Sequence, residues 1–378
     1  MVSDKEDRQY SVYFTRLKNA PAQFFRSEMN LGGSVRINPT GVALICGIII
    51  LLVYFNSGSS SSSASVDPRL RSQSTVNLAE LLSVAIAVAE AGGREVKEVR
   101  ELADIGESSK GKTREGANDP KTDGDMRAHV QMFYGLKKRF PNINIISEEH
   151  DEKEVDTSKV PMASISNPEI TKLLGPEGIE VAADDVAVWI DPLDATQEYT
   201  ESLLHFVTTM VCVAVKGVPT LGVIHKPFEG EGGKTAWGYA GQDVVSGTVR
   251  AAADNNKEDA DMTRARIIVS RSHAGNVKNV TTKTFGAGVQ VTPAGGAGYK
   301  AWEVVKGAQD AYIHTTLIKK WDICAGAAIL KALGGKMTTL KGDTIDFGRA
   351  DQEKNEGGLL ATMHQHDEFL DKLKVLSR

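Results

Sequence analysis

The sequence predicts a layered α+β fold, because strand and helix patterns follow one another without strict β-α-β alternation. The clearest strand is the nearly continuous apolar run at residues 206–215, whose β-branched side chains are typical of a central strand. The clearest helix begins after Asn77, with Leu78, Leu81 and Leu82 at helical spacing. We expect elements of both kinds to stack in layers around a shared core.

The remaining elements follow from the same two periodicities. We expect helices at residues 125–140, 297–306 and 322–333, and further strands at residues 143–147, 186–190, 220–224, 266–270 and 290–292. Gly92 and Gly93 are expected to interrupt the first helix, and Gly334 and Gly335 to end the last one. The charged and small residues at 251–261 are typical of a loop or a domain junction.

The composition is that of a globular protein, with 41% hydrophobic and 25% charged residues among 378. A chain of this length predicts two sub-domains, a metal-binding α+β part at residues 76–255 and a C-terminal α/β part at residues 256–378. The net charge of −5 provides no basic field for nucleic acid. Cys46, Cys212 and Cys324 suggest no disulfide framework, so cysteine usage does not decide the redox compartment.

An uncharged apolar run lies near the N-terminus. With its flanks it covers residues 37–56, which is about the length that spans a bilayer. A buried core helix is the alternative, but the serine-rich linker at residues 57–75 leaves the run no core to join. A cleaved signal peptide would lie closer to Met1. We therefore expect an uncleaved transmembrane signal anchor that follows a cytosolic tail at residues 1–36.

The flanks of this run indicate its orientation. Arg26 and Arg36 precede it, which favours a cytosolic N-terminus and a catalytic part in a lumen. Asn279 begins the single N-x-S/T glycosylation sequon, which is usable only in that topology. The sequence therefore predicts a single-pass type II membrane protein.

Acidic residues follow two of the predicted strands directly. Glu148 comes right after one apolar strand, and Asp191 and Asp194 follow the next one. The proline between these two aspartates rigidifies a turn that can aim both carboxylates and the Leu193 carbonyl at one point. Hard oxygen ligands of this kind suit Mg²⁺, so the segment predicts a magnesium site.

Each acidic residue also has a purely structural interpretation. Glu148 can belong to a solvated acidic turn, and Asp194 can cap a helix start. Asp322 opens an apolar helix, where an N-cap is a sufficient explanation, although a carboxylate there can cap the helix and bind a metal together. Asp123 and Asp125 can each cap the helix that follows them, or one of them can act as a base or a further ligand.

Together these segments resemble the signatures of the inositol monophosphatase family of Mg²⁺-dependent, Li⁺-sensitive phosphatases. They read SEEH at residues 147–150, WIDPLDATQEYTE at residues 189–201 and WDICAGAA at residues 321–328, in family order. The resemblance covers about residues 76–375 and implies the layered αβαβα sandwich of this family. The chain departs from the family pattern at Ala195, where most members have glycine.

The resemblance also implies roles for individual residues. Two or three Mg²⁺ ions would be bound by four carboxylates and one main-chain carbonyl, contributed by Glu148, Asp191, Leu193, Asp194 and Asp322. Asp125 matches the aspartate of a T-x-x-D motif of the family. With Thr196 it would orient and activate the attacking water.

Members of the family that hydrolyse nucleotides carry a serine and a histidine spaced three apart, followed by a glycine-rich turn with a lysine. Ser270 and His273 match the first feature, and GGAGYK at residues 295–300 matches the second. Gly296 and Lys300 would then contact the substrate, since a glycine-rich turn before a helix is an anion site of low specificity. A plain helix-entry loop explains this turn equally well.

The apolar run and an insert containing ASISNP distinguish the chain from cytosolic members, and it resembles Golgi-resident nucleotidases of the family. The expected reaction is hydrolysis of 3′-phosphoadenosine 5′-phosphate to AMP and phosphate in the Golgi lumen, which would support sulfation. The alternative is an inositol monophosphatase with the same metals and another pocket. A membrane-tethered pseudo-enzyme that binds the nucleotide is a third interpretation, which the complete carboxylate set disfavours.

Overall fold

The computed structural model of the protein describes residues 74–112, 116, 118–151, 153–175, 177–254, 261–271 and 277–374, without the side chains of 277–280. The predicted cytosolic tail, the signal anchor and nearly all of the serine-rich linker lie outside these residues. No helix within the described residues is both long and apolar enough to cross a membrane. The predicted sub-domain boundary at residue 255 also lies outside them and stays a prediction.

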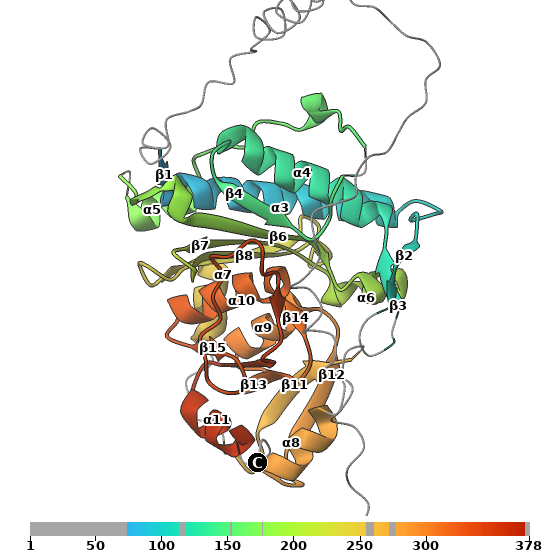
Figure 1. The fold of residues 1–378 in the computed structure, drawn as a ribbon, viewed down its shortest axis with the longest axis vertical. Coiled ribbons are helices and arrows are strands. Elements are labelled where there is room, and N and C mark those ends of the chain that lie inside the picture. The colour runs from blue at the N-terminus through green and yellow to red at the C-terminus, as the bar shows by residue number, and fades with distance from the viewer. Residues whose placement is uncertain are drawn as a thin grey trace, which may run out of the picture. The chain divides into compact units, whose positions relative to one another are not determined.

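The first sheet has six strands in the order β10-β9-β8-β7-β6-β4 (Figure 1). They are β4 (Asn144–Ser147), β6 (Val186–Asp194), β7 (Thr208–Val215), β8 (Val218–Lys226), β9 (Lys234–Tyr239) and β10 (Val244–Val245). β4 pairs parallel with β6, and the other neighbours are antiparallel. β6 is buried along its whole length and β7 along nearly all of it, as expected for central strands covered on both faces.

The second sheet has five strands in the order β12-β11-β13-β17-β15. They are β11 (Arg266–Ser270), β12 (Gln290–Ala294), β13 (Ala311–His314), β15 (Lys336–Thr338) and β17 (Leu359–Thr362). β12, β11 and β13 run parallel, whereas β17 is antiparallel to both β13 and β15. The parallel strands end at one edge of the sheet, where β11 ends in Ser270 and β12 in Ala294.

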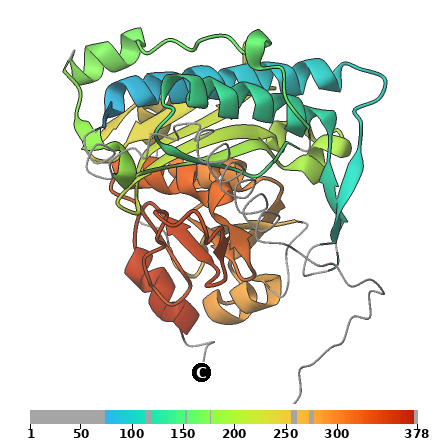
Figure 2. The ribbon, with the colours of Figure 1, turned by 45° about the horizontal axis from the view of Figure 1, so that its top comes forward.

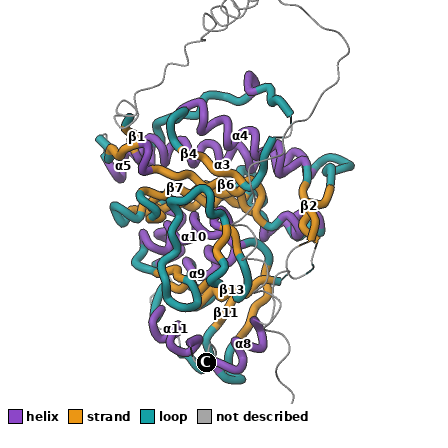
Figure 3. The backbone as a smooth tube through the Cα atoms, in the orientation of Figure 1, coloured by secondary structure: helices purple, strands orange, loops and turns teal. Residues whose placement is uncertain are grey.

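Helices cover the faces of both sheets and complete five layers (Figures 1 and 2). α3 (Leu78–Arg100) and α4 (Asp123–Arg139) share a core with one face of the six-stranded sheet. α9 (Ala297–Val305) and α10 (Lys320–Ala332) fill the space between the sheets, and Figure 3 shows these helices between two sets of strands. α8 (Val277–Phe285) and α11 (His366–Lys374) cover the outer face of the second sheet. The predicted layered α+β fold is confirmed.

Smaller elements connect these layers. Three two-stranded sheets pair β1 (Thr75–Asn77) with β5 (Glu180–Ala182), β2 (Ser108–Lys112) with β3 (Asn118–Lys121), and β14 (Ile318–Lys319) with β16 (Lys354–Asn355). Short helices are α5 (Pro168–Leu174), α6 (Thr196–Thr200) and α7 (Gly247–Ala253), with 3₁₀ turns at Thr157–Lys159, Ala183–Asp185 and Leu204–Phe206.

The expected interruption of the first helix at Gly92 and Gly93 is wrong. α3 runs through both glycines without a break, from Leu78 to Arg100. A side chain at Gly92 would lie 2.5 Å from the sulfur of Met132, and one at Gly93 would lie 2.4 Å from the ring of His225. The two glycines therefore let α3 approach its neighbours closely, and this packing outweighs their low helix propensity.

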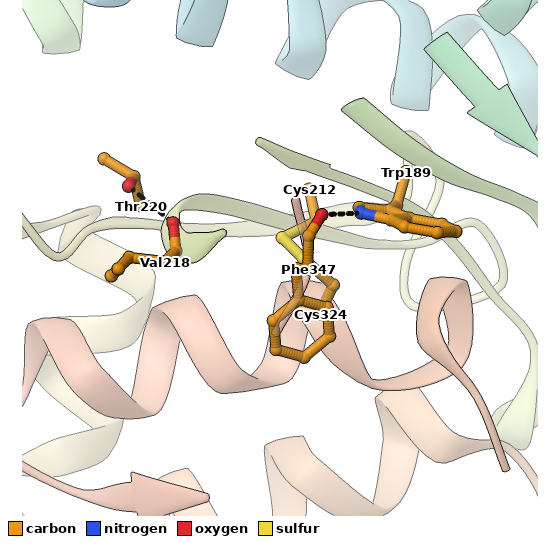
Figure 4. The surroundings of a disulfide bond; sticks show 6 residues. All are labelled: Trp189, Cys212, Val218, Thr220, Cys324 and Phe347. Carbon is orange, nitrogen blue, oxygen red and sulfur yellow. Dashed lines mark hydrogen bonds between the residues drawn. A yellow bond between two sulfur atoms is a disulfide. The ribbon is translucent and has the colours of Figure 1, made fainter. Parts of the chain in front are cut away.

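The expectation from the cysteines is also corrected. Cys212 of β7 and Cys324 of α10 form a disulfide that joins the six-stranded sheet to the central helix layer, with their Cα atoms 5.6 Å apart (Figure 4). Nearby, the indole N–H of Trp189 donates to the carbonyl of Phe347 at 2.8 Å. Two cysteines that lie 112 residues apart give no local sequence signal, which is why the pairing was missed.

Removing this disulfide tests its contribution to the fold. We expect a Cys212→Ala/Cys324→Ala variant to lose about 4–5 kcal/mol of unfolding free energy, the entropic estimate for a loop of this length. Chemical denaturation without reductant measures the difference, and Cys46→Ala is the matched control that should leave it unchanged. A double variant as stable as the wild type would contradict a structural role.

Candidate active site

Three carboxylates converge at one edge of the six-stranded sheet. β4 and β6 are parallel neighbours, so Glu148, which follows β4, and Asp191, near the end of β6, lie at the same edge, and the Glu148 N–H donates to the Ile190 carbonyl at 3.1 Å. Asp322 reaches the same point from the first turn of α10, where it also accepts from the Lys319 N–H at 3.0 Å. One oxygen from each of the three carboxylates lies within 4.8 Å of the other two.

The electrostatics of this trio fit a bound cation. Burial, followed by the charge of Glu148, raises the pKa of both Asp191 and Asp322 well above its ordinary value. Asp191 is only 1% exposed, and its Oδ1 has no hydrogen-bond partner within the described residues. Buried carboxylates repel one another unless positive charge separates them, and their oxygens are the ligands that Mg²⁺ prefers. The trio can therefore hold a metal ion.

Asp194 lies beside the trio but is held differently. Its carboxylate accepts from the N–H groups of Ala297 and Gly298 at 2.9 and 2.8 Å, and from the Thr208 hydroxyl at 2.9 Å. It therefore caps α9 from a distant part of the chain. The sequence predicts an anion site at the glycine-rich turn. In the structure, the anion bound there is the carboxylate of Asp194. α6 begins after Ala195 without any side-chain cap, so Asp194 does not cap the helix that follows it.

Asp125 and Thr196 form a second group at the same edge. The Thr196 hydroxyl lies 3.1 Å from Asp125 Oδ1 and 3.0 Å from the Leu193 carbonyl oxygen. Asp125 is buried and accepts from both the N–H and the hydroxyl of Thr122. Burial raises the pKa of Asp125 to about 7, although the hydrogen bond from Thr122 opposes the rise. Asp123 is exposed, so Asp125 is the aspartate that contacts Thr196.

The turn that carries these groups depends on a strained residue. Ala195 adopts a left-handed conformation with φ +71°, which costs an alanine roughly 1 kcal/mol and favours glycine. Its methyl group faces Gly296, where an added side-chain atom would lie only 3.4 Å away. Alanine in place of the glycine of the family pattern therefore removes none of the carboxylates. The Ala195 methyl group lies close to the N-cap residue of α9.

Lys110 belongs to the site and was not foreseen. It extends from β2 and pairs with Glu148 at 2.8 Å and with Glu149, which also pairs with Lys121. Burial alone would lower the pKa of Lys110, but Glu148 and Glu149 together hold it above its usual value. The polar sequence around it has no periodicity, so only the pairing of β2 with β3 brings this cation to the carboxylates.

The residues predicted to bind substrate fall partly into the same cavity. A cavity of about 630 Å³ is lined by the trio of carboxylates and also by Ser270, Gly296 and Lys300. Lys300 is buried, and its ammonium group donates to the Gly296 carbonyl. Burial lowers the pKa of Lys300 to about 8, against the opposing charge of Asp194. His273 lies outside the described residues.

Comparison with known proteins assigns the chain to a family. The model of the inositol monophosphatase family matches residues 77–373, so the chain belongs to that family. Inositol monophosphatase 3 of Danio rerio is 47% identical over 336 residues, covering 87% of this chain and 93% of that protein. The Golgi-resident adenosine 3′,5′-bisphosphate 3′-phosphatase of Mus musculus is 45% identical over 365 residues, covering 91% and 98%.

A solved structure supports the same assignment at the level of the fold. Inositol monophosphatase from Anabaena superimposes with a TM-score of 0.54 at 18% identity, covering 79% of this chain and 97% of that one. The family and these relatives make the chain a phosphoric monoester hydrolase.

The crowded carboxylates predict how stability depends on pH and Mg²⁺. The pKa of Asp125 is raised from 3.8 to about 7 by folding, and those of Asp191 and Asp322 are also raised. The folded state then holds protons that the unfolded state has lost, so metal-free stability falls as the pH rises from about 4 through about 7. We expect Mg²⁺ to raise the melting temperature more at pH 7.5 than at pH 5.5, as thermal denaturation can measure.

Asp191→Asn is the variant that tests the origin of this effect. It should make stability depend less steeply on pH and remove most of the stabilisation by Mg²⁺. It should also lower turnover about a hundredfold or more, the scale of charge stabilisation by a metal ion. Asp185→Asn is the matched control, because Asp185 lies just before β6 and pairs with Lys216 away from the trio. Equal Mg²⁺ stabilisation in both variants would place the metal elsewhere.

Proposed function

We propose that the protein is a Mg²⁺-dependent, Li⁺-sensitive 3′(2′),5′-bisphosphate nucleotidase that hydrolyses 3′-phosphoadenosine 5′-phosphate to AMP and phosphate. The observation that carries the proposal is the meeting of the Glu148, Asp191 and Asp322 carboxylates in one cavity with residues of the glycine-rich turn. Relatives from several mammals at 43–49% identity carry the name of an adenosine 3′,5′-bisphosphate 3′-phosphatase, which supports this substrate.

In this proposal the carboxylates bind the metal ions, and the Asp125–Thr196 pair activates the attacking water. Glu148, Asp191, Asp194, Asp322 and the Leu193 carbonyl would hold two or three Mg²⁺ ions, which supply charge neutralisation and acidify a water. Thr196 would position the attacking water, and Asp125 would accept its proton as the water oxygen forms a bond to phosphorus. As the bond from phosphorus to the 3′ oxygen breaks, that oxygen would take up a proton from solvent, and AMP would leave. The burial of Asp125 and its contact with the Thr196 hydroxyl suit it to take a proton from a water that Thr196 holds.

The nucleotide would be held by the residues of the second sheet and of α9. Ser270 ends β11, Gly296 is the N-cap of α9, and Lys300 follows within its first turn. All three line the cavity, where Lys300 provides a cation for a substrate that carries two phosphates. His273 lies outside the described residues and is proposed as a further substrate-binding residue.

We also propose that residues 37–56 anchor the chain in the Golgi membrane, with the catalytic part in the lumen. The Cys212–Cys324 disulfide supports a luminal position, because such bonds persist in oxidising compartments. The sequon that begins at Asn279 lies in α8, and its Thr281 is fully buried. Membrane anchoring would place the enzyme beside the sulfotransferases that release this nucleotide.

An inositol monophosphatase is the second candidate. The Danio rerio relative carries that name at 47% identity, and the trio together with the Asp125–Thr196 pair would serve that reaction equally well. The two candidate functions differ in whether the wall of the cavity binds a second phosphate.

A phosphate-release assay on the purified chain separates the candidates. We expect rapid, Li⁺-inhibited release of one phosphate from 3′-phosphoadenosine 5′-phosphate. The reason is that Lys300 lines the same cavity as the trio and provides a cation for the second phosphate. AMP, the product, should not be hydrolysed further, and Asp125→Asn should be inactive on every substrate. A preference for inositol monophosphate over the nucleotide would reject the proposal.

The topology has its own test. Intact microsomes that contain the protein should protect the catalytic part from added protease, while the N-terminal tail is removed, because the anchor shields only the luminal side. Detergent is the control and should expose the whole chain. A catalytic part that is digested in intact microsomes would reverse the proposed orientation.

A further inference from the structure

An arginine lies next to the candidate nucleotide wall, which is formed by Ser270, Gly296 and Lys300. It is bound by Glu198 of α6 and by Glu201, the residue that ends this helix. Arg271 follows Ser270 at the end of β11. Its guanidinium lies 3.0 Å from Glu198 Oε1 and 2.6 Å from Glu201 Oε2, and its Nε donates to Glu198 at 3.1 Å. The side chain of Arg271 is 35% exposed, whereas that of Glu198 is 3% exposed. The interaction therefore compensates a buried charge and differs from an ordinary surface ion pair.

Glu198 has little room for any other arrangement. A side-chain atom at Gly295 would lie 2.3 Å from the Glu198 carboxyl carbon, so the glycine-rich turn lies directly on this carboxylate. Glu198 also lines the cavity, two residues after Thr196. A buried carboxylate in this place without its arginine would add negative charge where an anionic substrate must bind.

The main chain of Arg271 is tied to the same turn. Its N–H donates to the Ala294 carbonyl at 3.0 Å, and Ala294 is the residue before Gly295. β11 and β12 are in register here, with Ser270 opposite Ala294. One residue therefore joins three segments: α6 through its side chain, the end of β11 through its position, and the glycine-rich turn through its N–H.

We propose that Arg271 and Glu198 form a positioning clamp that sets the nucleotide wall of the cavity without taking part in phosphate transfer. This inference rests on the proposed nucleotidase function. Ser270, Gly296 and Lys300 belong to the segments that the clamp joins, whereas Glu148, Asp191 and Asp322 come from β4, β6 and α10. Loss of the clamp should therefore weaken nucleotide binding and leave the chemical step nearly intact.

Steady-state kinetics of three variants and one control variant test the clamp. With 3′-phosphoadenosine 5′-phosphate, Arg271→Ala should raise KM about tenfold, as expected when a buried carboxylate loses its partner, with kcat changed less than about twofold. Arg271→Lys should lie between this variant and the wild type. Adding Glu198→Gln to Arg271→Ala should recover part of the loss, because no unpaired buried charge remains. With p-nitrophenyl phosphate, which has no nucleoside for the wall to hold, kcat of all of these should resemble the wild type and KM should rise clearly less than with the nucleotide.

Arg266→Ala is the matched control. Arg266 lies on the same strand and pairs with Asp310, which does not line the cavity. The control should leave KM unchanged. Unchanged KM in Arg271→Ala, or an equal fall of kcat on both substrates, would overturn the clamp. A wild-type enzyme that ignores the nucleotide would instead reject the proposed function, which is a separate outcome of the same assay.

Discussion

Three carboxylates from three separate elements face one another in this protein, with Asp191 buried, and Lys110 pairs with Glu148 alone among them. Hydrogen bonds among the three carboxylates cannot relieve their repulsion, since each of them can only accept when ionised. The fold holds the groups together because β4 and β6 run parallel, side by side, and because α10 is packed between the two sheets. The carboxylates thus remain close although burial and the charge of Glu148 raise the pKa of both Asp191 and Asp322, and Asp322 also raises that of Asp191. A divalent cation bound there would remove this repulsion.

The rest of the site is organised around that constraint. Asp194 accepts hydrogen bonds from the amides that begin α9, which joins the end of β6 to the helix layer between the sheets. The Cys212–Cys324 disulfide holds α10 on β7 only two residues after Asp322. Arg271 adds a connection from α6 to the glycine-rich turn. Each of these contacts joins segments that are distant in sequence, so the edge with the three carboxylates and the candidate nucleotide wall belong to one framework.

The sequence was sufficient to predict the elements that carry the site. The expected strand at 266–270 matches β11, and the expected helix at 297–306 differs from α9 by one residue, because both have a clear apolar period and flanking turns. Asp125 and Thr196 were predicted to act as a pair and lie in contact. β6 runs on to Asp194, past its predicted end, because the acidic turn still pairs with β7.

What could not be predicted depends on contacts between distant segments. The glycines of α3 look like a helix break until Met132 and His225 are seen packed against them. Lys110 and Arg271 are ordinary polar residues in sequence, and they become part of the site through strand pairing. The disulfide and the capping of α9 by Asp194 likewise join segments more than a hundred residues apart. Local periodicity contains no information about such pairs.

The claim on which the account depends is that the trio of Glu148, Asp191 and Asp322 binds a divalent cation. Anomalous diffraction from crystals of the protein grown with Mn²⁺ in place of Mg²⁺ tests this claim most directly. The account predicts a strong anomalous peak within coordination distance of oxygens from all three carboxylates. A map without a peak there, with Lys110 still paired to Glu148, would contradict it.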